Sequence, residues 1–347
     1  MNGLSKLGLT AVAVAGGAAL VRTLRDSLID YDFTDRIAVV TGGTRGLGLL
    51  LARELVTRGA RVAVLGRDLE ELERGVEDLT KEGGEAIGVP CDVRQREQVQ
   101  WAMDHILARL GPVDILINNA GVIQVGPIDH MTEQDFQDAL AIHCWAPFYT
   151  MQAVIPGMRA RGEGRIVNIC SIGGKIAVPH LAPYTTSKFA LAGLSEAMRV
   201  ELAKDKIYVT TVYPGLMRTG SHLNAMFKGK NREEFAWFAM FDALPITSIS
   251  AKRAARQIIN ACRRGDPQMI VSIQAKLAVL FHELMPTTSL RLMDYVNRVL
   301  PAPSPQQGQE LHSGWESSSK WAPSLLTRLA DRATAANNEL RGHTPIQ

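Results

Sequence analysis

Short apolar runs alternate with longer segments of mixed polarity through most of the chain. Runs of this length and composition are typical of buried strands, and the mixed segments carry apolar residues at helical spacing. We predict strands at 36–41, 61–65, 86–91, 115–118, 165–170, 208–213 and 268–273. We predict helices at 48–58, 69–82, 97–109, 184–203 and 249–263. This alternation predicts an α/β fold, a doubly wound (Rossmann-type) parallel sheet with helices on both faces.

The composition changes at both ends of this pattern. We expect three parts: an apolar N-terminal extension (1–34), a Rossmann-fold domain (35–300) and a Pro/Ser-rich tail (301–347) in which residues 324–341 could form an amphipathic helix. Residues 275–300 have helical spacing and could pack on the core, mediate association or lie on a membrane surface.

Overall composition excludes several functions. An apolar share of 46% and a charged share of 21% fit a globular protein. A net charge of +3 without a basic run gives no support for binding nucleic acid. The cysteines Cys91, Cys144, Cys170 and Cys262 are scattered and the histidines are not clustered, so we expect neither a disulfide framework nor a metal site.

A glycine-rich loop lies directly between the first predicted strand and its helix. Glycine lets the backbone approach a pyrophosphate, and the helix N-terminus supplies free N–H groups and positive potential. With a strand before it and a helix after it, the loop predicts a dinucleotide site. Its candidate residues are Thr41, Gly42, Thr44, Arg45, Gly46, Leu47 and Gly48.

The end of the second strand indicates which dinucleotide binds. An NAD site usually presents a carboxylate there, whereas an arginine accommodates the 2′-phosphate of NADP. The chain has Gly66 and then Arg67 at this point, and Arg45 lies in the glycine loop. Asp68 is the counterargument, but we interpret it as the cap of the next helix. We therefore favour NADP(H) over NAD(H).

Two further strand ends fit the same site. Asp92 and Val93 follow the third strand, where Asp92 could accept a hydrogen bond from adenine. Asn119, Ala120 and Gly121 follow the fourth strand, where small residues permit close approach of a cofactor. For each segment the alternative is a polar turn.

Tyr184 and Lys188 are spaced by four residues in a predicted helix, which places them on one face. A free phenol has a pKa of about 10, and a neighbouring cation favours its ionised form. Such a pair alone is weak evidence, but Ser171 precedes it at a compatible spacing. Together with the glycine loop, these residues predict a catalytic site.

The motifs, taken in order, resemble those of the short-chain dehydrogenase/reductase family, in its classical branch, over about residues 35–273. The resemblance implies that Tyr184 is the catalytic acid/base and that Lys188 lowers its pKa and holds the nicotinamide ribose. It implies that Ser171 orients the substrate oxygen, and that the Pro214–Gly215 turn and the Thr219 hydroxyl line the nicotinamide. It also implies a homo-oligomer, by analogy.

One position departs from the family pattern. Members usually carry an asparagine in the helix after the Asn-Asn-Ala-Gly segment, and this chain has His143 there. An imidazole can donate and accept hydrogen bonds, so His143 could relay protons. The alternative is a core histidine satisfied by its neighbours.

Residues 218–245 are rich in aromatics and are expected to form a substrate lid. Phe235, Trp237, Phe238 and Phe241 favour an apolar substrate, or they pack the lid against the core. We predict an NADP(H)-dependent oxidoreductase that transfers hydride between nicotinamide and an apolar ketone or secondary alcohol. The alternative is a catalytically impaired dinucleotide-binding regulatory or scaffold protein.

Residues 7–21 form an uncharged stretch near the N-terminus. As a helix it would span about 22 Å, short of the roughly 30 Å hydrocarbon core. It could be a membrane-associating helix, a packed helix or a cleaved signal, although export would separate the enzyme from its cofactor. We favour a cytoplasmic protein with peripheral membrane contact through this stretch.

Overall fold

The computed structural model describes residues 31–81, 83–243, 248–304, 308–317 and 337–339. The chain divides into two compact units, residues 1–32 and 33–347. The predicted division into an N-terminal extension, a Rossmann-fold domain and a tail stays a prediction. The apolar stretch at 7–21 and nearly all of the possible tail helix lie outside the described residues. None of the helices that the structure describes is both long enough and apolar enough to span a bilayer.

A seven-stranded parallel sheet forms the centre of the second unit. Its order is β11-β7-β6-β4-β1-β2-β3, and all neighbouring strands are parallel. The strands are β1 (Ile37–Thr41), β2 (Arg61–Gly66), β3 (Ala86–Pro90), β4 (Ile115–Asn118), β6 (Gly164–Ile169), β7 (Ile207–Tyr213) and β11 (Gln268–Ile270). The seven predicted strands and the doubly wound fold are confirmed.

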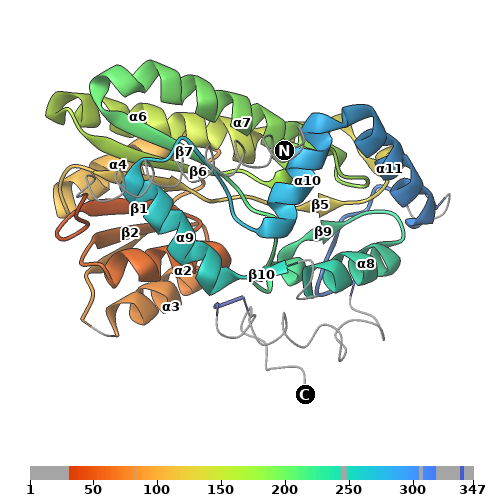
Figure 1. The fold of residues 1–347 in the computed structure, drawn as a ribbon. Helices are drawn as coiled ribbons and strands as arrows, with labels where there is room; N and C mark the ends of the chain where they lie inside the picture. The colour runs from red at the N-terminus through yellow and green to blue at the C-terminus, as the bar shows by residue number, and fades with distance from the viewer. Residues whose placement is uncertain (1–30, 82, 244–247, 305–307, 318–336, 340–347) are drawn as a thin grey trace, which may run out of the picture. The chain divides into compact units, whose positions relative to one another are not determined.

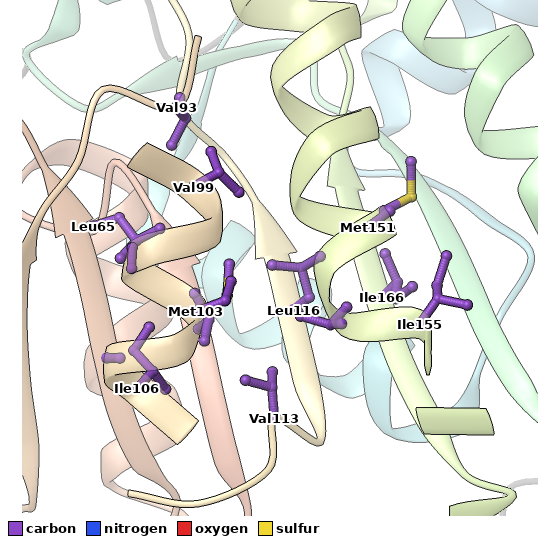
Figure 2. Close-up of a cluster of buried hydrophobic side chains, with 14 of the residues drawn as sticks. Leu65, Val93, Val99, Met103, Ile106, Val113, Leu116, Met151, Ile155 and Ile166 are labelled. Atoms are coloured by element: carbon purple, nitrogen blue, oxygen red, sulfur yellow. The ribbon is translucent and has the colours of Figure 1, made fainter. Parts of the chain in front are cut away.

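Helices cover both faces of the sheet (Figure 1). One layer contains α4 (Arg96–Arg109), α6 (Ala146–Arg161) and α7 (Ala182–Leu202), and the other contains α2 (Gly46–Val56), α3 (Leu69–Thr80) and α9 (Ala251–Arg264). Figure 2 shows the core between the sheet and the first layer, where Met103, Ile106, Leu116 and Met151 are buried. Burying a side chain of this size contributes about 1.5–3 kcal/mol.

A chain of buried polar groups joins the central strands to two helices. Asn118 Nδ2 on β4 donates to Asn168 Oδ1 on β6 (2.9 Å), and Asn168 Nδ2 donates to Ser195 Oγ on α7 (2.9 Å). The Thr211 hydroxyl on β7 donates to the same Ser195 oxygen (2.7 Å), and the Thr150 hydroxyl on α6 donates to Asn118 Oδ1 (2.6 Å). These bonds satisfy the buried groups and hold strands and helices in register beside the carboxyl ends of β4 and β6.

Three local features differ from the sequence-based expectations. The last strand ends at Ile270 because the Ser272 hydroxyl caps a helix, accepting a hydrogen bond from the Ala275 N–H (3.1 Å). Residues 275–300 form two helices, α10 (Ile273–Leu284) and α11 (Pro286–Val299), and Pro286 takes the first position of the second helix, where its missing N–H is not needed. The segment around His143 is a π-helical turn (Ala141–Trp145) between α5 (Glu133–Leu140) and α6.

Short elements complete the fold. Three 3₁₀ turns lie at Ile128–His130, Ile172–Gly174 and Ala203–Asp205, and a fourth lies at Ser221–Asn224. The lid helix is α8 (Asn231–Ala243). Strand β12 (His312–Ser313) pairs with β9 (Met226–Phe227), which also pairs with β5 (Gln124–Val125), and β10 (Ser248–Ser250) pairs with β8 (Leu216–Arg218). Part of the predicted tail is thus built into the lid.

Candidate active site

A cavity of about 1350 Å³ lies at the carboxyl ends of the central strands, where ligands bind in open α/β sheets. It has the glycine loop at one end, Ser171 and Tyr184 on its wall, and lid aromatics at the other end. The predicted site residues that line it are Gly42, Thr44, Arg45, Gly46, Leu47, Arg67, Asp92, Val93, Asn119, Ala120, Gly121, His143, Ser171, Tyr184, Lys188, Pro214, Gly215 and Thr219. Of the predicted residues, Thr41 and Gly48 alone are not on this wall.

Thr41 and Asn119 position the glycine loop against the neighbouring strand end. The Thr41 hydroxyl accepts hydrogen bonds from the N–H groups of Asn119 (2.9 Å) and Ala120 (3.0 Å). Asn119 Nδ2 donates to the carbonyl oxygens of Thr41 (3.2 Å) and Gly42 (3.1 Å). Gly42 has φ +60°, and a Cβ there would lie 3.1 Å from Ala120 Cα. Only glycine therefore leaves room for a backbone cradle of this kind, which fits a dinucleotide.

The residues after β2 support the interpretation of Asp68 as a helix cap. Its carboxylate accepts a hydrogen bond from the Glu71 N–H (3.0 Å) at the start of α3. Arg67 is exposed at the cavity edge. Arg74, about one turn after Glu71 in α3, also lines the cavity. The sequence analysis did not predict it because no motif includes it.

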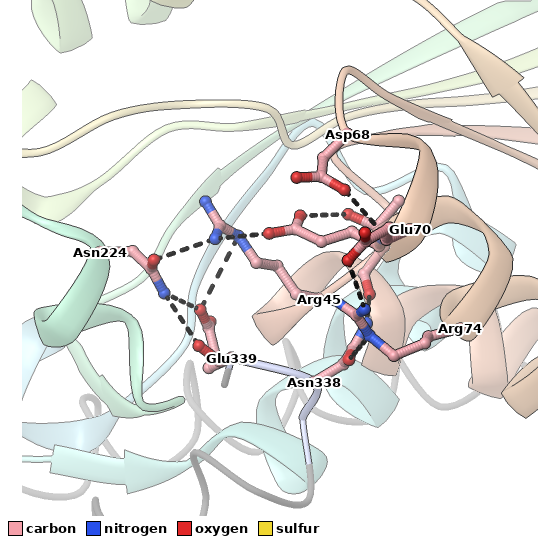
Figure 3. Close-up of polar contacts among 9 residues, drawn as sticks. Arg45, Asp68, Glu70, Arg74, Asn224, Asn338 and Glu339 are labelled. Atoms are coloured by element: carbon pink, nitrogen blue, oxygen red, sulfur yellow. Dashed lines mark hydrogen bonds and ion pairs between the residues drawn. The ribbon is translucent and has the colours of Figure 1, made fainter. Parts of the chain in front are cut away.

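Arg45 is more constrained than expected. Its Nη1 donates to Glu71 Oε1 (3.1 Å) and to Asn224 Oδ1 (3.0 Å), as Figure 3 shows for Asn224. A third neighbour is Glu339, whose Oε2 lies 3.8 Å from Arg45 Nε. A guanidinium already paired with carboxylates has less capacity left for a phosphate. Asn224 and Glu339 are cavity residues that the sequence analysis did not find.

Asp92 also has an internal partner. Its carboxylate accepts hydrogen bonds from Arg94 Nε (3.0 and 3.1 Å) and Nη2 (2.6 Å). The Arg94 guanidinium holds the pKa of Asp92 below its ordinary value, although burial acts in the opposite direction. Asp92 is therefore a fixed carboxylate at the cavity wall, and a bond to adenine stays a prediction.

Ser171, Tyr184 and Lys188 come together as predicted. Ser171 follows β6 and caps a 3₁₀ turn, where its Oγ accepts from the Gly173 N–H (3.0 Å) and is hydrogen-bonded to Tyr184. Tyr184 lies in the first turn of α7, and Lys188 lies one turn later. Lys188 Nζ donates to the Ile169 carbonyl oxygen (2.9 Å) and lies 5.6 Å from the centroid of the Tyr184 ring.

The pKa values differ from the simple expectation. Burial raises the pKa of Tyr184 to about 12, and its hydrogen bond with Ser171 offsets part of that rise. Burial lowers the pKa of Lys188 to about 8. The expected lowering of the Tyr184 pKa by Lys188 is thus not seen, because loss of hydration outweighs other influences on the phenol. In this arrangement both groups hold a proton at neutral pH for most of the time.

His143 is buried with both ring nitrogens occupied. Its Nε2 accepts from the Val122 N–H (3.2 Å), so Nδ1 carries the proton and donates to Ser187 Oγ (2.8 Å). The Ser187 hydroxyl in turn donates to the Tyr184 carbonyl oxygen (2.8 Å). Burial, followed by the Lys188 charge, lowers the pKa of His143 well below its ordinary value, so the ring is neutral. These contacts favour the interpretation of His143 as a core histidine satisfied by its neighbours, because a proton relay through the ring would require one of these hydrogen bonds to open.

The lid aromatics divide between wall and core. Phe235 and Phe238 are buried in a cluster with Phe227, while Trp237 and Phe241 line the cavity together with Phe238. The Trp237 indole donates to Glu234 Oε2 (2.7 Å). The wall continues onto the helix pair and the residue that follows it, through Gln274, Ala275, Ala278, Val296 and Leu300. The far end of the cavity is therefore mainly apolar.

A buried ion pair ties the lid to the domain, which the sequence analysis did not predict. Lys228 Nζ lies 2.6 Å from Asp135 Oδ2, and the two side chains are 5% and 10% exposed. Asp135 also accepts from the N–H (2.7 Å) and hydroxyl (2.9 Å) of Thr132 and is hydrogen-bonded to Gln124. Lys228 follows β9 and lies in the interior, where the Asp135 carboxylate neutralises its charge.

All four cysteines are unpaired. Cys170 Sγ lies beside the site and donates to the Lys188 carbonyl oxygen (3.1 Å). Burial raises the pKa of the thiols of Cys91 and Cys262 to about 11 and 12, and it also raises those of Cys144 and Cys170. The thiols are therefore weak nucleophiles.

Comparison with known families decides the class of protein. The sequence model of the short chain dehydrogenase family matches residues 36–228. The chain belongs to this family. Its members are NAD(P)-dependent oxidoreductases, so the comparison favours an enzyme over an impaired scaffold protein.

Individual relatives agree with the family assignment. The Mycobacterium tuberculosis protein SadH is 32% identical over 264 residues, which cover 75% of this chain and 95% of the relative. The L-sorbose reductase of Gluconobacter frateurii, solved with NADPH and L-sorbose, is 25% identical with a TM-score of 0.63 over 70% of this chain and 97% of that one. An actinorhodin polyketide ketoreductase solved with NADPH is 31% identical with a TM-score of 0.61 over 68% of this chain and 94% of that one.

Proposed function

We propose that this short-chain dehydrogenase/reductase uses NADPH to reduce an apolar ketone, or catalyses the reverse oxidation of a secondary alcohol. One observation carries the proposal. The hydroxyl groups of Ser171 and Tyr184 lie on the wall of a single cavity, between a glycine loop at one end and an apolar chamber at the other.

The residues present fit a nicotinamide dinucleotide. A side chain at Gly42 would be strained by the positive φ and would contact Ala120 tightly, and the α2 N-terminus lies beside this cradle. We propose that the glycine loop, Asn119 and Thr219 hold the cofactor, which supplies or accepts a hydride when bound. Arg67 and Arg74 favour NADPH, because Asp68 is engaged as a helix cap rather than turned toward a ribose. The two NADPH-bound relatives support the same choice.

The protonation states suit the proton-transfer step of ketone reduction. With a pKa of about 12, the Tyr184 phenol is protonated at neutral pH and can give its proton to a carbonyl oxygen. The Ser171 hydroxyl orients that oxygen by a hydrogen bond. Lys188, with a pKa of about 8, holds a proton nearby that can restore the phenol. His143 fixes the backbone of this helix turn through Ser187.

The apolar chamber supports a hydrophobic substrate. Trp237, Phe238 and Phe241 form one wall, and Val296 and Leu300 continue it. Removing apolar substrate surface from water would contribute about 25 cal/mol per Å² before the costs of binding. Because one relative was solved with L-sorbose, a polar polyhydroxy ketone is the competing substrate class for this test.

The test is NADPH oxidation measured with matched ketones of increasing chain length and with L-sorbose. We expect kcat/KM to rise with apolar chain length and to exceed that for L-sorbose, and we expect NADPH to be preferred over NADH. Tyr184→Phe, which keeps the ring but removes the hydroxyl, should lower turnover by about 10²–10⁴-fold while NADPH still binds. Higher kcat/KM for the sugar than for every apolar ketone would overturn the substrate assignment.

We also propose that the enzyme self-associates, as its family resemblance implies. Trp145, Phe189 and Val200 are exposed apolar side chains on the layer that contains α6 and α7. Light scattering on a size-exclusion column tests this, and a monomer at assay concentration contradicts it. Peripheral membrane contact through residues 7–21 stays a prediction.

A further inference from the structure

A short C-terminal segment, Asn337–Glu339, lies against the glycine loop. The Gly46 N–H, at the start of α2, donates to the Asn337 carbonyl oxygen (2.8 Å). Asn338 Nδ2 donates to the Thr44 carbonyl oxygen (2.9 Å), and Asn338 Oδ1 accepts from Arg74 Nε (3.1 Å). Figure 3 shows Asn338 beside Arg74 and Glu339 beside Arg45.

The same segment reaches the opposite side of the cavity. Asn337 Nδ2 donates to the Thr219 carbonyl oxygen (3.0 Å). Asn224 Nδ2 donates to Glu339 Oε2 (2.6 Å). Thr219 and Asn224 lie within the lid segment (218–245), so residues 337–339 connect the glycine loop to the lid across the cavity.

The Glu339 carboxylate lies where a helix N-terminus attracts an anion. Its side chain is among the cavity-lining groups and is almost fully buried, at 2% exposure for the residue. A Cβ added at Gly46 would meet Glu339 Oε1, which shows how closely the carboxylate approaches the loop. The first-turn N–H of Gly46 is already bonded to Asn337. The segment thus offers the loop a carbonyl and a carboxylate in place of a phosphate.

Charge makes simultaneous occupation unfavourable. A dinucleotide brings its negative pyrophosphate to this loop, and NADPH adds a 2′-phosphate. Arg45, the cation in the loop, is already shared among Glu71, Asn224 and Glu339. Burial raises the pKa of Glu339 to about 7, so its carboxyl group is partly ionised at neutral pH. In its ionised form, a phosphate beside it would compete for the Arg45 guanidinium and be repelled by the carboxylate.

We propose that residues 337–339 occupy the phosphate-binding end of the cofactor cavity and compete with NADPH, so that cofactor binding displaces them. The C-terminal segment is then an internal competitive inhibitor of cofactor binding. The proposal depends on the nicotinamide site and not on the identity of the substrate. Its test therefore uses binding and needs no turnover.

The first experiment compares the full chain with a variant that ends at residue 336, by NADPH fluorescence titration. If the segment is docked in about nine molecules out of ten, the apparent Kd is raised about tenfold, and the shortened chain should bind about tenfold more tightly.

A matched pair of point variants tests the role of the Glu339 side chain. Glu339→Ala should tighten NADPH binding, whereas Glu310→Ala, which alters an exposed tail glutamate, should not. Unchanged or weaker binding by both the shortened chain and Glu339→Ala overturns the proposal.

The second experiment uses the intact protein and so does not depend on a variant that folds. Binding linkage is reciprocal, so NADPH must loosen the segment if the segment opposes NADPH. Hydrogen exchange followed by mass spectrometry should show faster exchange in the peptide that contains residues 337–339 when saturating NADPH is added. Slower exchange would mean that the segment closes over bound cofactor, and unchanged exchange would mean that the two sites are independent. Either result refutes competition.

Discussion

Replacing Lys228 by methionine tests whether the buried ion pair with Asp135 anchors the lid. The substitution keeps the length of the side chain and removes its charge, leaving Asp135 without its cation in the interior. Removing one partner of a buried pair costs about 3–5 kcal/mol. Asp135 retains hydrogen bonds from Thr132 and Gln124, so we expect the lower value, about 3 kcal/mol. For a domain of this size that corresponds to a fall in Tm of roughly 6 °C, at about 2 °C per kcal/mol.

The chain contains its own control for this experiment. Lys230 lies 3.9 Å from Glu233, and these side chains are 37% and 60% exposed. Exposed pairs of this kind contribute about 0–1 kcal/mol, so Lys230→Met should leave stability almost unchanged. The measurement is urea unfolding followed by circular dichroism, with thermal unfolding as a check. Equal stability of the two variants would refute the assignment of an anchoring role to Lys228.

The pH dependence gives a second check on the same pair. Burial raises the pKa of Asp135, but hydrogen bonds from Lys228, Thr132 and Gln124 outweigh it and hold the pKa below its ordinary value. A depressed carboxyl pKa stabilises the fold above the unfolded-state value, and that stability is lost as pH falls through the folded-state value. The difference between the parent protein and Lys228→Met should therefore shrink in acid. A difference that stays constant from neutral pH into that acid range would contradict the role of this carboxylate.

Three further outcomes follow from the site. Tyr184→Phe should lower kcat by about 10²–10⁴-fold with little change in NADPH affinity, because only proton transfer is lost; titration and steady-state kinetics measure the two effects. His143→Ala should lower thermal stability and kcat together without moving the pH optimum if the ring only positions helix α7, whereas a shifted pH profile would support a relay. Asp68→Ala should cost about 1 kcal/mol through the lost cap while leaving the NADPH to NADH ratio of kcat/KM unchanged, and a changed ratio would contradict the cap interpretation.

The sequence predicted the parts of the fold that depend on neighbouring residues. Short apolar runs separated by amphipathic helices gave the order of strands and helices, and the glycine loop needs only its adjacent strand and helix for recognition. Ser171, Tyr184 and Lys188 follow from one strand end and one helix turn. The structure brings these groups to one cavity because parallel strands place their carboxyl ends on one edge.

The features that could not be predicted from the sequence depend on contacts between residues that are far apart in the chain. Asp135 and Lys228 are 93 positions apart, and Thr44 and Asn338 are 294 positions apart, so no local pattern marks either contact. The pKa of Tyr184 also depends on burial, which the spacing to Lys188 does not report. For His143, the sequence identified the unusual position, but its two hydrogen-bond partners come from separate segments.

The state of the four thiols makes this enzyme convenient for site-specific labelling. Thiols that rarely ionise react slowly with maleimides, so a cysteine introduced at exposed Glu310 should carry nearly all of a fluorophore added at neutral pH. Brief labelling would then need no cysteine-free background, and the dye would report movement of the chain beyond the lid in single molecules.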